Sequence, residues 1–184
     1  VRIALNAKYG VNVSYKNGDF KWVQMPPPAL FGALETGRVD AATLIHSMAY
    51  KAEKSGNFRV IAYTSRDLYE KLGVDTVSAV NVSYPEKLKA RPEAFKEFNR
   101  MLKASVDYAV ANPQKVGEAI AKDAGISPDF FSAWLKRYST FPAVVSKADT
   151  KAYETVWANA KKLEILKFPY PKGEDVVWEH AIRE

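Results

Sequence analysis

The chain has 184 residues, of which 47% are hydrophobic and 26% charged, so it is long enough to bury a core and has the composition of an ordinary globular protein. Its formal net charge is +6, but the 27 basic residues are scattered, and the densest groups, Lys87 to Arg91 and Lys161-Lys162, lie among carboxylates or beside apolar helical faces. No run alternates basic residues with stacking aromatic residues, and we therefore expect no nucleic-acid partner.

Cysteine and histidine usage limits the chemistry further. The chain contains no cysteine, which excludes a disulfide framework, a thiol nucleophile and any cysteine-based metal site. The two histidines, His46 and His180, have no metal-type partner three or four residues away, so we expect neither a metal site nor a cofactor. No apolar stretch approaches the roughly 18 residues that a membrane-spanning helix needs.

The first half of the chain alternates between predicted strands and predicted helices. Four segments have the apolar content of short strands: Phe20 to Met25, Val39 to Ile45, Phe58 to Thr64 and Thr76 to Ser83. Helices are expected from Pro28 to a stop at Gly37, and from Met48 to Lys54. Strands separated by helices are typical of βαβ units, so residues 1–84 predict an α/β lobe with crossover strands.

Residues 85–184 predict helices that pack on another lobe. Pro92 stands at a plausible first helical position, and apolar residues recur at steps of three and four until Asn112-Pro113. A helix that carries Val116, Ala119 and Ile120 is expected to end at Gly125, and Ser127 is the expected cap of the next helix. A later helix extends to Leu163. The expected buried stripes of these last two helices are Phe131, Trp134, Leu135 and Tyr138, and Tyr153, Val156, Trp157 and Ala160. The four tryptophans are interpreted as core residues rather than as a sugar-stacking surface. They are Trp22, Trp134, Trp157 and Trp178.

Two motifs resemble a known family. Residues Ala33 to Ala41 read A-L-x-x-G-x-V-D-A, and the stretches Ala90 to Phe95 and Tyr108 to Pro113 open and close the long helix. With these motifs the chain resembles ABC-transporter substrate-binding proteins of the alkanesulfonate, taurine and thiamine-precursor class. The resemblance implies an α/β fold of the type II periplasmic-binding class. Because members have two α/β lobes, we expect the strands of the N-terminal lobe to be missing from this chain.

Candidate ligand contacts follow three of the predicted strands. In open α/β sheets ligands bind beyond the carboxyl ends of the strands, where donors and acceptors converge. An imidazole and a hydroxyl offer hydrogen bonds there, while a tyrosine ring and a guanidinium can stack on or pair with an organic anion. The alternative is that these are ordinary polar loop residues. The candidate ligand-binding residues are Met25, His46, Ser47, Tyr63, Thr64 and Arg66.

Nothing in the sequence predicts catalysis. Ser47 is not part of a G-x-S-x-G elbow, and the carboxylates do not form the pair that general acid and base catalysis needs. The resemblance implies the solute-binding component of an ABC importer, which captures a small polar organic molecule, anionic ones included, and delivers it to a membrane permease. Such a protein is periplasmic, or extracellular as a secreted or lipid-anchored protein. The alternatives are an enzyme similar to thiamine-pyrimidine synthases, which need a cysteine-rich iron motif, and the effector-sensing domain of a transcription regulator.

Overall fold

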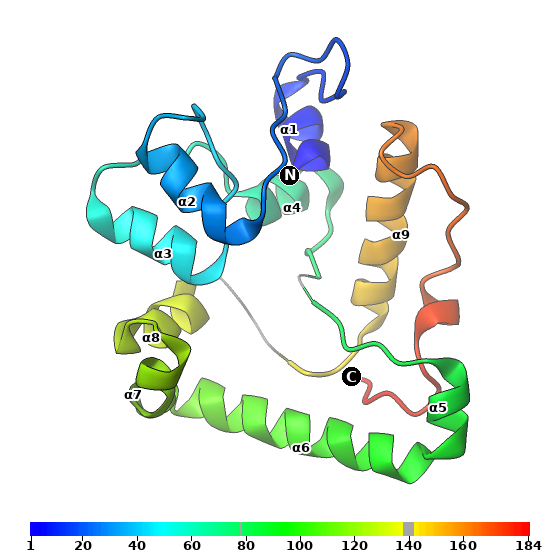
Figure 1. Cartoon of the computed structure of the whole chain (residues 1–184). Coiled ribbons are helices and arrows are strands. Elements are labelled where there is room, and N and C mark those ends of the chain that lie inside the picture. Colours follow the sequence, from blue (N-terminus) through cyan, green and yellow to red (C-terminus); the bar gives the residue numbers. More distant parts are fainter. Residues whose placement is uncertain (78, 138–141) are drawn as a thin grey trace. The chain divides into compact units, whose positions relative to one another are not determined.

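The structure is a computed structural model that describes residues 1–77, 79–137 and 142–184. These residues form α-helices joined by loops (Figure 1). The elements are α1 (Arg2–Tyr9), α2 (Pro27–Glu35), α3 (His46–Ser55), α4 (Thr64–Leu72), α5 (Pro85–Ala90), α6 (Pro92–Ala111), α7 (Pro113–Ala124), α8 (Pro128–Arg137) and α9 (Lys147–Lys162), with a 3-10 helix, η1, at Glu174–Val176.

The predicted α/β fold class is wrong. No described residue belongs to a β-strand, and the one isolated bridge in the described ranges pairs Val145 with Arg183. Among the predicted strands, residues 20–25, 39–45 and 58–63 are loops, and Thr64 already begins α4. The fourth, Thr76 to Ser83, contains residue 78, which lies outside the described residues; its other residues are also loop.

The physical reason is that an apolar, β-branched run forms a strand only when a neighbouring strand satisfies its backbone groups. No backbone hydrogen bond joins the described parts of these segments to one another. Their β-branched side chains are also left in solvent, with Val60 51% exposed and Ile61 64% exposed. Local composition therefore predicted strands that tertiary pairing does not form.

Most predicted helices are confirmed. The helix expected from Pro28 is α2, and the chain turns at Gly37 with a φ of 68°. The helix expected from Met48 is α3, which begins two residues earlier, and those expected in the second half are α6 to α9. Tyr138, predicted as part of the α8 stripe, lies outside the described residues. Helices α1, α4 and α5 were not predicted.

The chain divides into two compact units, each built from separate stretches. The first unit comprises Val1–Phe20, Ala62–Asp107 and Pro142–Glu184, and the second comprises Lys21–Ile61 and Tyr108–Phe141. Helix α6 begins in the first unit and ends in the second. The predicted boundary between an α/β lobe (residues 1–84) and a helical part (residues 85–184) lies within one stretch of the first unit. This division into domains stays a prediction.

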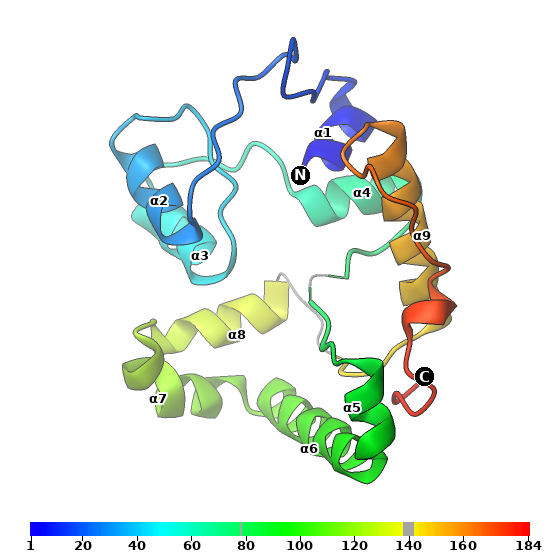
Figure 2. The same cartoon turned by 45° about the vertical axis from the view of Figure 1, so that its right-hand side comes forward.

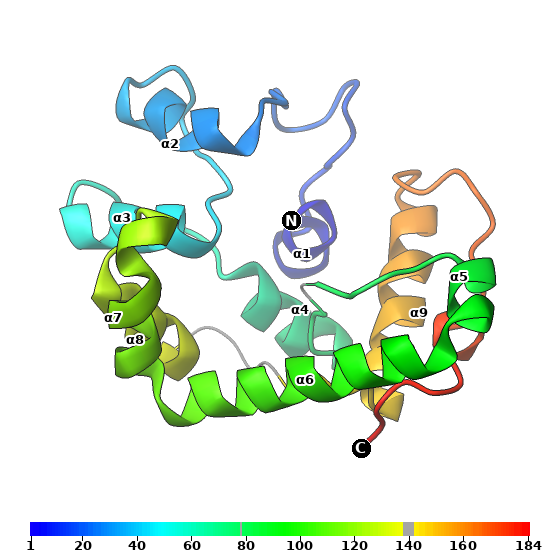
Figure 3. The same cartoon turned by 60° about the horizontal axis from the view of Figure 1, so that its bottom comes forward.

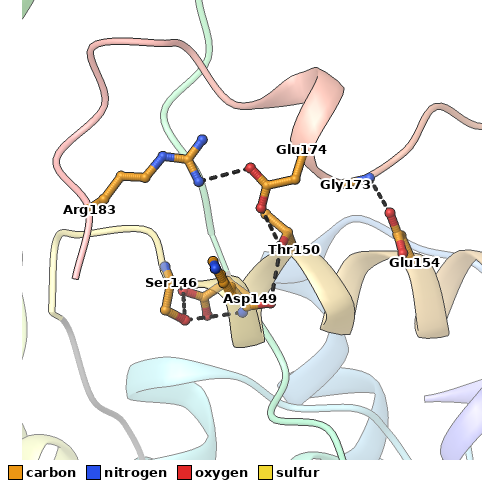
Figure 4. Close-up of polar contacts among 8 residues, drawn as sticks. Ser146, Asp149, Thr150, Glu154, Gly173, Glu174 and Arg183 are labelled. Carbon is orange, nitrogen blue, oxygen red and sulfur yellow. Dashed lines mark hydrogen bonds and ion pairs between the residues drawn. The ribbon is translucent and has the colours of Figure 1, made fainter.

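In the first unit, α1 packs on α4 (Figure 3). Ala4 and Leu68 are buried, at 0% and 6% exposed, and Arg2 Nε donates to the Val13 carbonyl at 2.8 Å to hold the loop after α1. Helix α9 begins with a capping box: the Asp149 N–H donates to the Ser146 hydroxyl at 3.2 Å, and the Ser146 N–H donates to Asp149 Oδ2 at 2.8 Å (Figure 4).

In the second unit, α7 packs on α8, and α8 also contacts α3. Aromatic rings fill this contact: Tyr50 of α3 meets Phe130 of α8 edge-on at 5.7 Å between ring centroids. Both side chains are 6–8% exposed, so these rings belong to the core of the unit. The side chain of Phe31 joins the same unit's core by an edge contact with Phe58 at 5.8 Å.

Candidate functional site

His46 and Ser47 are the first two residues of α3 and not, as predicted, loop residues after a strand. The preceding residue, Ile45, offers no side-chain cap. Among the described residues, neither the His46 N–H nor the Ser47 N–H has a hydrogen-bond acceptor, as is usual for the uncapped first turn of a helix. Two backbone donors and the positive end of the helix dipole therefore lie beside the imidazole and the hydroxyl.

His46 has a backbone conformation that few residues other than glycine adopt. Its φ is 49°, in the left-handed region, where a residue with a Cβ is strained and persists only because its surroundings hold it there. Its ring stacks on Trp134 of α8, with 5.1 Å between centroids and 27° between planes. Trp134 in turn contacts Phe130 at 5.4 Å. The aromatic core of the second unit thus holds an exposed imidazole at the start of α3.

Met25 lines a hollow of about 480 Å³ beside α2 in the same unit. No lining residue carries a negative charge, and one, Arg38, carries a positive charge. Arg38 is exposed and has no carboxylate partner in the described part of the chain. The lining residues are Val23, Gln24, Met25, Pro26, Ala29, Gly32, Ala33, Thr36 and Arg38.

The other three predicted residues lie at the start of α4, in the first unit. Tyr63 is the N-cap residue of α4 and Thr64 is its first residue. The Arg66 guanidinium lies over the Tyr63 ring, 4.6 Å from its centroid, and Arg66 Nε lies 3.7 Å from Glu70 Oε1. The predicted stacking surface and the predicted cation are thus already paired with each other.

The six predicted ligand residues fall into two groups, one in each unit. Met25, His46 and Ser47 belong to the second unit, and Tyr63, Thr64 and Arg66 belong to the first. A single site formed by all six stays a prediction. The described residues contain no group of three or more histidine, aspartate or glutamate side chains arranged to hold a metal ion.

Sequence reasoning missed two features of this region. Trp134 was interpreted as core, and its apolar stripe gave no sign that its ring also stacks on His46. Thr36 and Arg38 lie just beyond the end of α2 and line the same hollow as Met25. The sequence indicated only that they follow a helix stop, and not that they lie near Met25. Their proximity depends on how the loop before α2 returns along that helix.

In comparison with known proteins, the chain matches a family described as NMT1/THI5 like over residues 4–116. This match covers more than half of the chain, and the chain therefore belongs to that family. The family is that of alkanesulfonate- and taurine-binding proteins and thiamine-precursor proteins, and it includes both ABC substrate-binding proteins and THI5 synthases. No curated protein and no solved structure matches the chain. The predicted family is confirmed at this level.

The family suggests that the chain binds a small molecule. Within the part of the chain that the structure describes, no helix has the length and apolar character needed to cross a membrane.

Proposed function

We propose that this chain acts in an ABC importer as its solute-binding component, capturing a small polar organic molecule and delivering it to a membrane permease. The observation that supports this most is the family match over residues 4–116, because ABC substrate-binding proteins are members of that family. On this proposal the protein works in the periplasm or outside the cell and changes no covalent bond of its ligand.

The proposed contacts are those at the start of α3. The Ser47 hydroxyl and the two unpaired N–H groups of His46 and Ser47 can donate to an acidic or carbonyl group, which the helix dipole also favours. The His46 ring, backed by Trp134, offers a flat surface and a hydrogen-bonding nitrogen. Met25 and Arg38 beside the hollow offer apolar contact and a positive charge to an organic anion.

Binding can be tested with three probes that represent the family: taurine, a short alkanesulfonate and a substituted pyrimidine. A thermal-shift screen selects the probe that stabilises the protein, since a ligand that binds only the folded state raises its melting temperature. Calorimetry then compares the wild type with His46→Ala and Ser47→Ala. Each variant should weaken binding about fivefold to a hundredfold, because a desolvated ligand group loses its partner.

Two controls separate binding from stability. His180→Ala makes the same substitution at the only other histidine, and it should leave the affinity unchanged. Trp157→Ala should lower the melting temperature but not the affinity, because Trp157 stacks on Tyr153 at 5.7 Å and contacts Tyr170 at 5.7 Å. If both α3 variants bind the selected probe as the wild type does, the proposed site is wrong.

The rival function in the same family is a synthase. Mass spectrometry of the probe after prolonged incubation distinguishes the two functions, because a binding component returns its ligand unaltered. Release of a modified product would contradict the proposed function while leaving a binding site at α3 intact.

A further inference from the structure

The last residues of the chain return along α9. We call residues 168–184 the C-terminal strap; in Figures 1 and 2 it is the orange-red to red segment beside α9. The strap and α9 both belong to the first unit. Apolar burial holds part of it: Phe168 is 72% exposed and Val176 51% exposed, whereas Tyr170, Trp178 and Ile182 are half-buried. Polar contacts supply the rest of its attachment.

Glu174 makes the central polar contacts of the strap, and each of its two carboxylate oxygens accepts a hydrogen bond (Figure 4). Thr150 of α9, only 5% exposed, donates its hydroxyl to Glu174 Oε1 at 2.9 Å. Arg183 Nη1, from the end of the strap, donates to Glu174 Oε2 at 2.9 Å. One side chain thus ties the strap to the helix and closes the strap on itself.

A second carboxylate acts beside the first. The Gly173 N–H donates to Glu154 Oε1 of α9 at 2.6 Å (Figure 4). Gly173 is buried, and a Cβ at this position would overlap the Thr150 carbonyl oxygen. The backbone of the strap therefore lies directly against the helix at the residue before Glu174.

Other contacts also hold the strap. The Val145 N–H donates to the Ile182 carbonyl at 2.9 Å, and Tyr170 meets the Trp157 ring. Trp178 contacts Phe95 of α6 edge-on at 6.2 Å. In the described residues, each side-chain hydrogen bond between the strap and α9 has a carboxylate as its acceptor.

The charged groups around Glu174 favour its ionised form. The Thr150 hydroxyl and then Arg183 lower the pKa of Glu174, and Lys147 on α9 adds a smaller attraction. The other titratable groups that face the strap are Glu154 on α9, Lys161 over the Tyr170 ring, and Glu93 on α6 near His180. Asp149 is engaged in the capping box at the start of α9.

We propose that the C-terminal strap is a separately opening element stabilised by Glu174, so that loss of this carboxylate contact makes opening of residues 168–184 from α9 about fivefold more frequent while the helices stay folded. Release uncovers Thr150 and the face of α9 on which Gly173 lies. The strap is thereby a conformational device of the first unit, and it is independent of the function proposed above.

Hydrogen exchange followed by mass spectrometry tests this on the whole chain. Glu174→Gln removes the charge and keeps the shape, and Thr150→Val removes the donor on the other side. The matched control is Glu179→Gln on the same strap, since the Glu179 side chain is 81% exposed and lies 3.8 Å from its sequence neighbour His180. Both test variants should speed exchange of strap amides and of the Val145 amide about fivefold, as expected for the loss of one hydrogen bond.

Exchange in α1, α4 and the middle of α9 should stay as in the wild type. Three results would overturn the proposal: Glu174→Gln exchanging like Glu179→Gln, Thr150→Val leaving the strap protected, or exchange rising equally in the strap and in α1. The last result would mean that Glu174 contributes to global stability and does not hold a separate element.

Discussion

The ammonium nitrogen of Lys8 on α1 lies 2.6 Å from Oδ1 of Asp67 on α4, and this ion pair joins residues 59 positions apart. The Asp67 side chain is 1% exposed, and its second oxygen, Oδ2, is buried without a hydrogen-bond partner in the described residues. Lys8 also contacts Glu70 at 2.9 Å. The contact with Asp67, followed by that with Glu70, raises the pKa of Lys8 to about 12. A buried carboxylate thus depends on a single ammonium.

We expect the two halves of this pair to respond unequally to mutation. Asp67→Asn should lower the free energy of unfolding by about 1.5–3 kcal/mol, the usual range for a hydrogen bond to a charged group. Lys8→Met should lower it further, because it leaves the Asp67 carboxylate buried without a counter-ion. Urea unfolding measures both. Because the pKa of Lys8 is raised, its contribution is complete below pH 10.5 and is lost as the pH rises through about 12.

The control for this prediction is Lys103→Met. Lys103 pairs with Asp107 at 2.8 Å on the exposed face of α6, and such pairs contribute about 0.3–0.5 kcal/mol. Equal losses in Lys8→Met and Lys103→Met would show that burial of Asp67 has no energetic consequence.

Two glycines inside helices should respond to alanine with opposite signs. A Cβ on Gly32 of α2 meets nothing within 4 Å, so Gly32→Ala should stabilise the protein by about 0.5–1 kcal/mol through helix propensity. A Cβ on Gly117 of α7 would overlap the Pro128 carbonyl oxygen at the start of α8. Gly117→Ala should therefore destabilise the protein by about 1–3 kcal/mol. Thermal unfolding of the two variants tests this, and stabilisation by Gly117→Ala would refute the close packing of α7 on α8.

Glu174 predicts a specific dependence of stability on acid pH. Its folded-state pKa is lowered, so its stabilising contribution is present above the ordinary value of 4.5 and is lost as the pH falls through the lower folded value. Below pH 4.5 the free energy of opening the strap, measured by hydrogen exchange of its amides, should therefore fall more steeply in the wild type than in Glu174→Gln. Glu93 and Glu97 also have lowered pKa values, from Lys96 and Arg100, and they contribute equally to both proteins. Parallel curves for the two proteins would contradict the prediction.

Helix positions were predictable where local signals suffice. Pro92 and Asn112-Pro113 mark the ends of α6, and Gly125 ends α7 in the left-handed conformation with a φ of 61°. The family could also be predicted, because the A-L-x-x-G-x-V-D-A motif at residues 33–41 and the second motif at residues 90–113 both lie inside the matched range 4–116.

The helices could be predicted but the absence of a sheet could not. A helix forms its backbone hydrogen bonds within one segment, whereas a strand needs a partner strand that is often far away in sequence. Residues 58–63 have the composition of a strand, but the described chain brings no partner to them. The candidate site was predictable only in part: His46 and Ser47 were selected as loop residues, and their place at an uncapped helix start depends on where α3 begins.

The family, the absence of cysteine chemistry and the positions of most helices could be predicted, because they depend on residue identity and on contacts within a few positions along the chain. The three-dimensional arrangement was needed to establish that the predicted strands are loops, that Trp134 stacks on His46, and that Lys8 neutralises Asp67. It also decided that Glu174 ties the end of the chain to Thr150. Each of these relationships joins residues that are distant in sequence, and such contacts depend on the packing of whole elements rather than on local propensity.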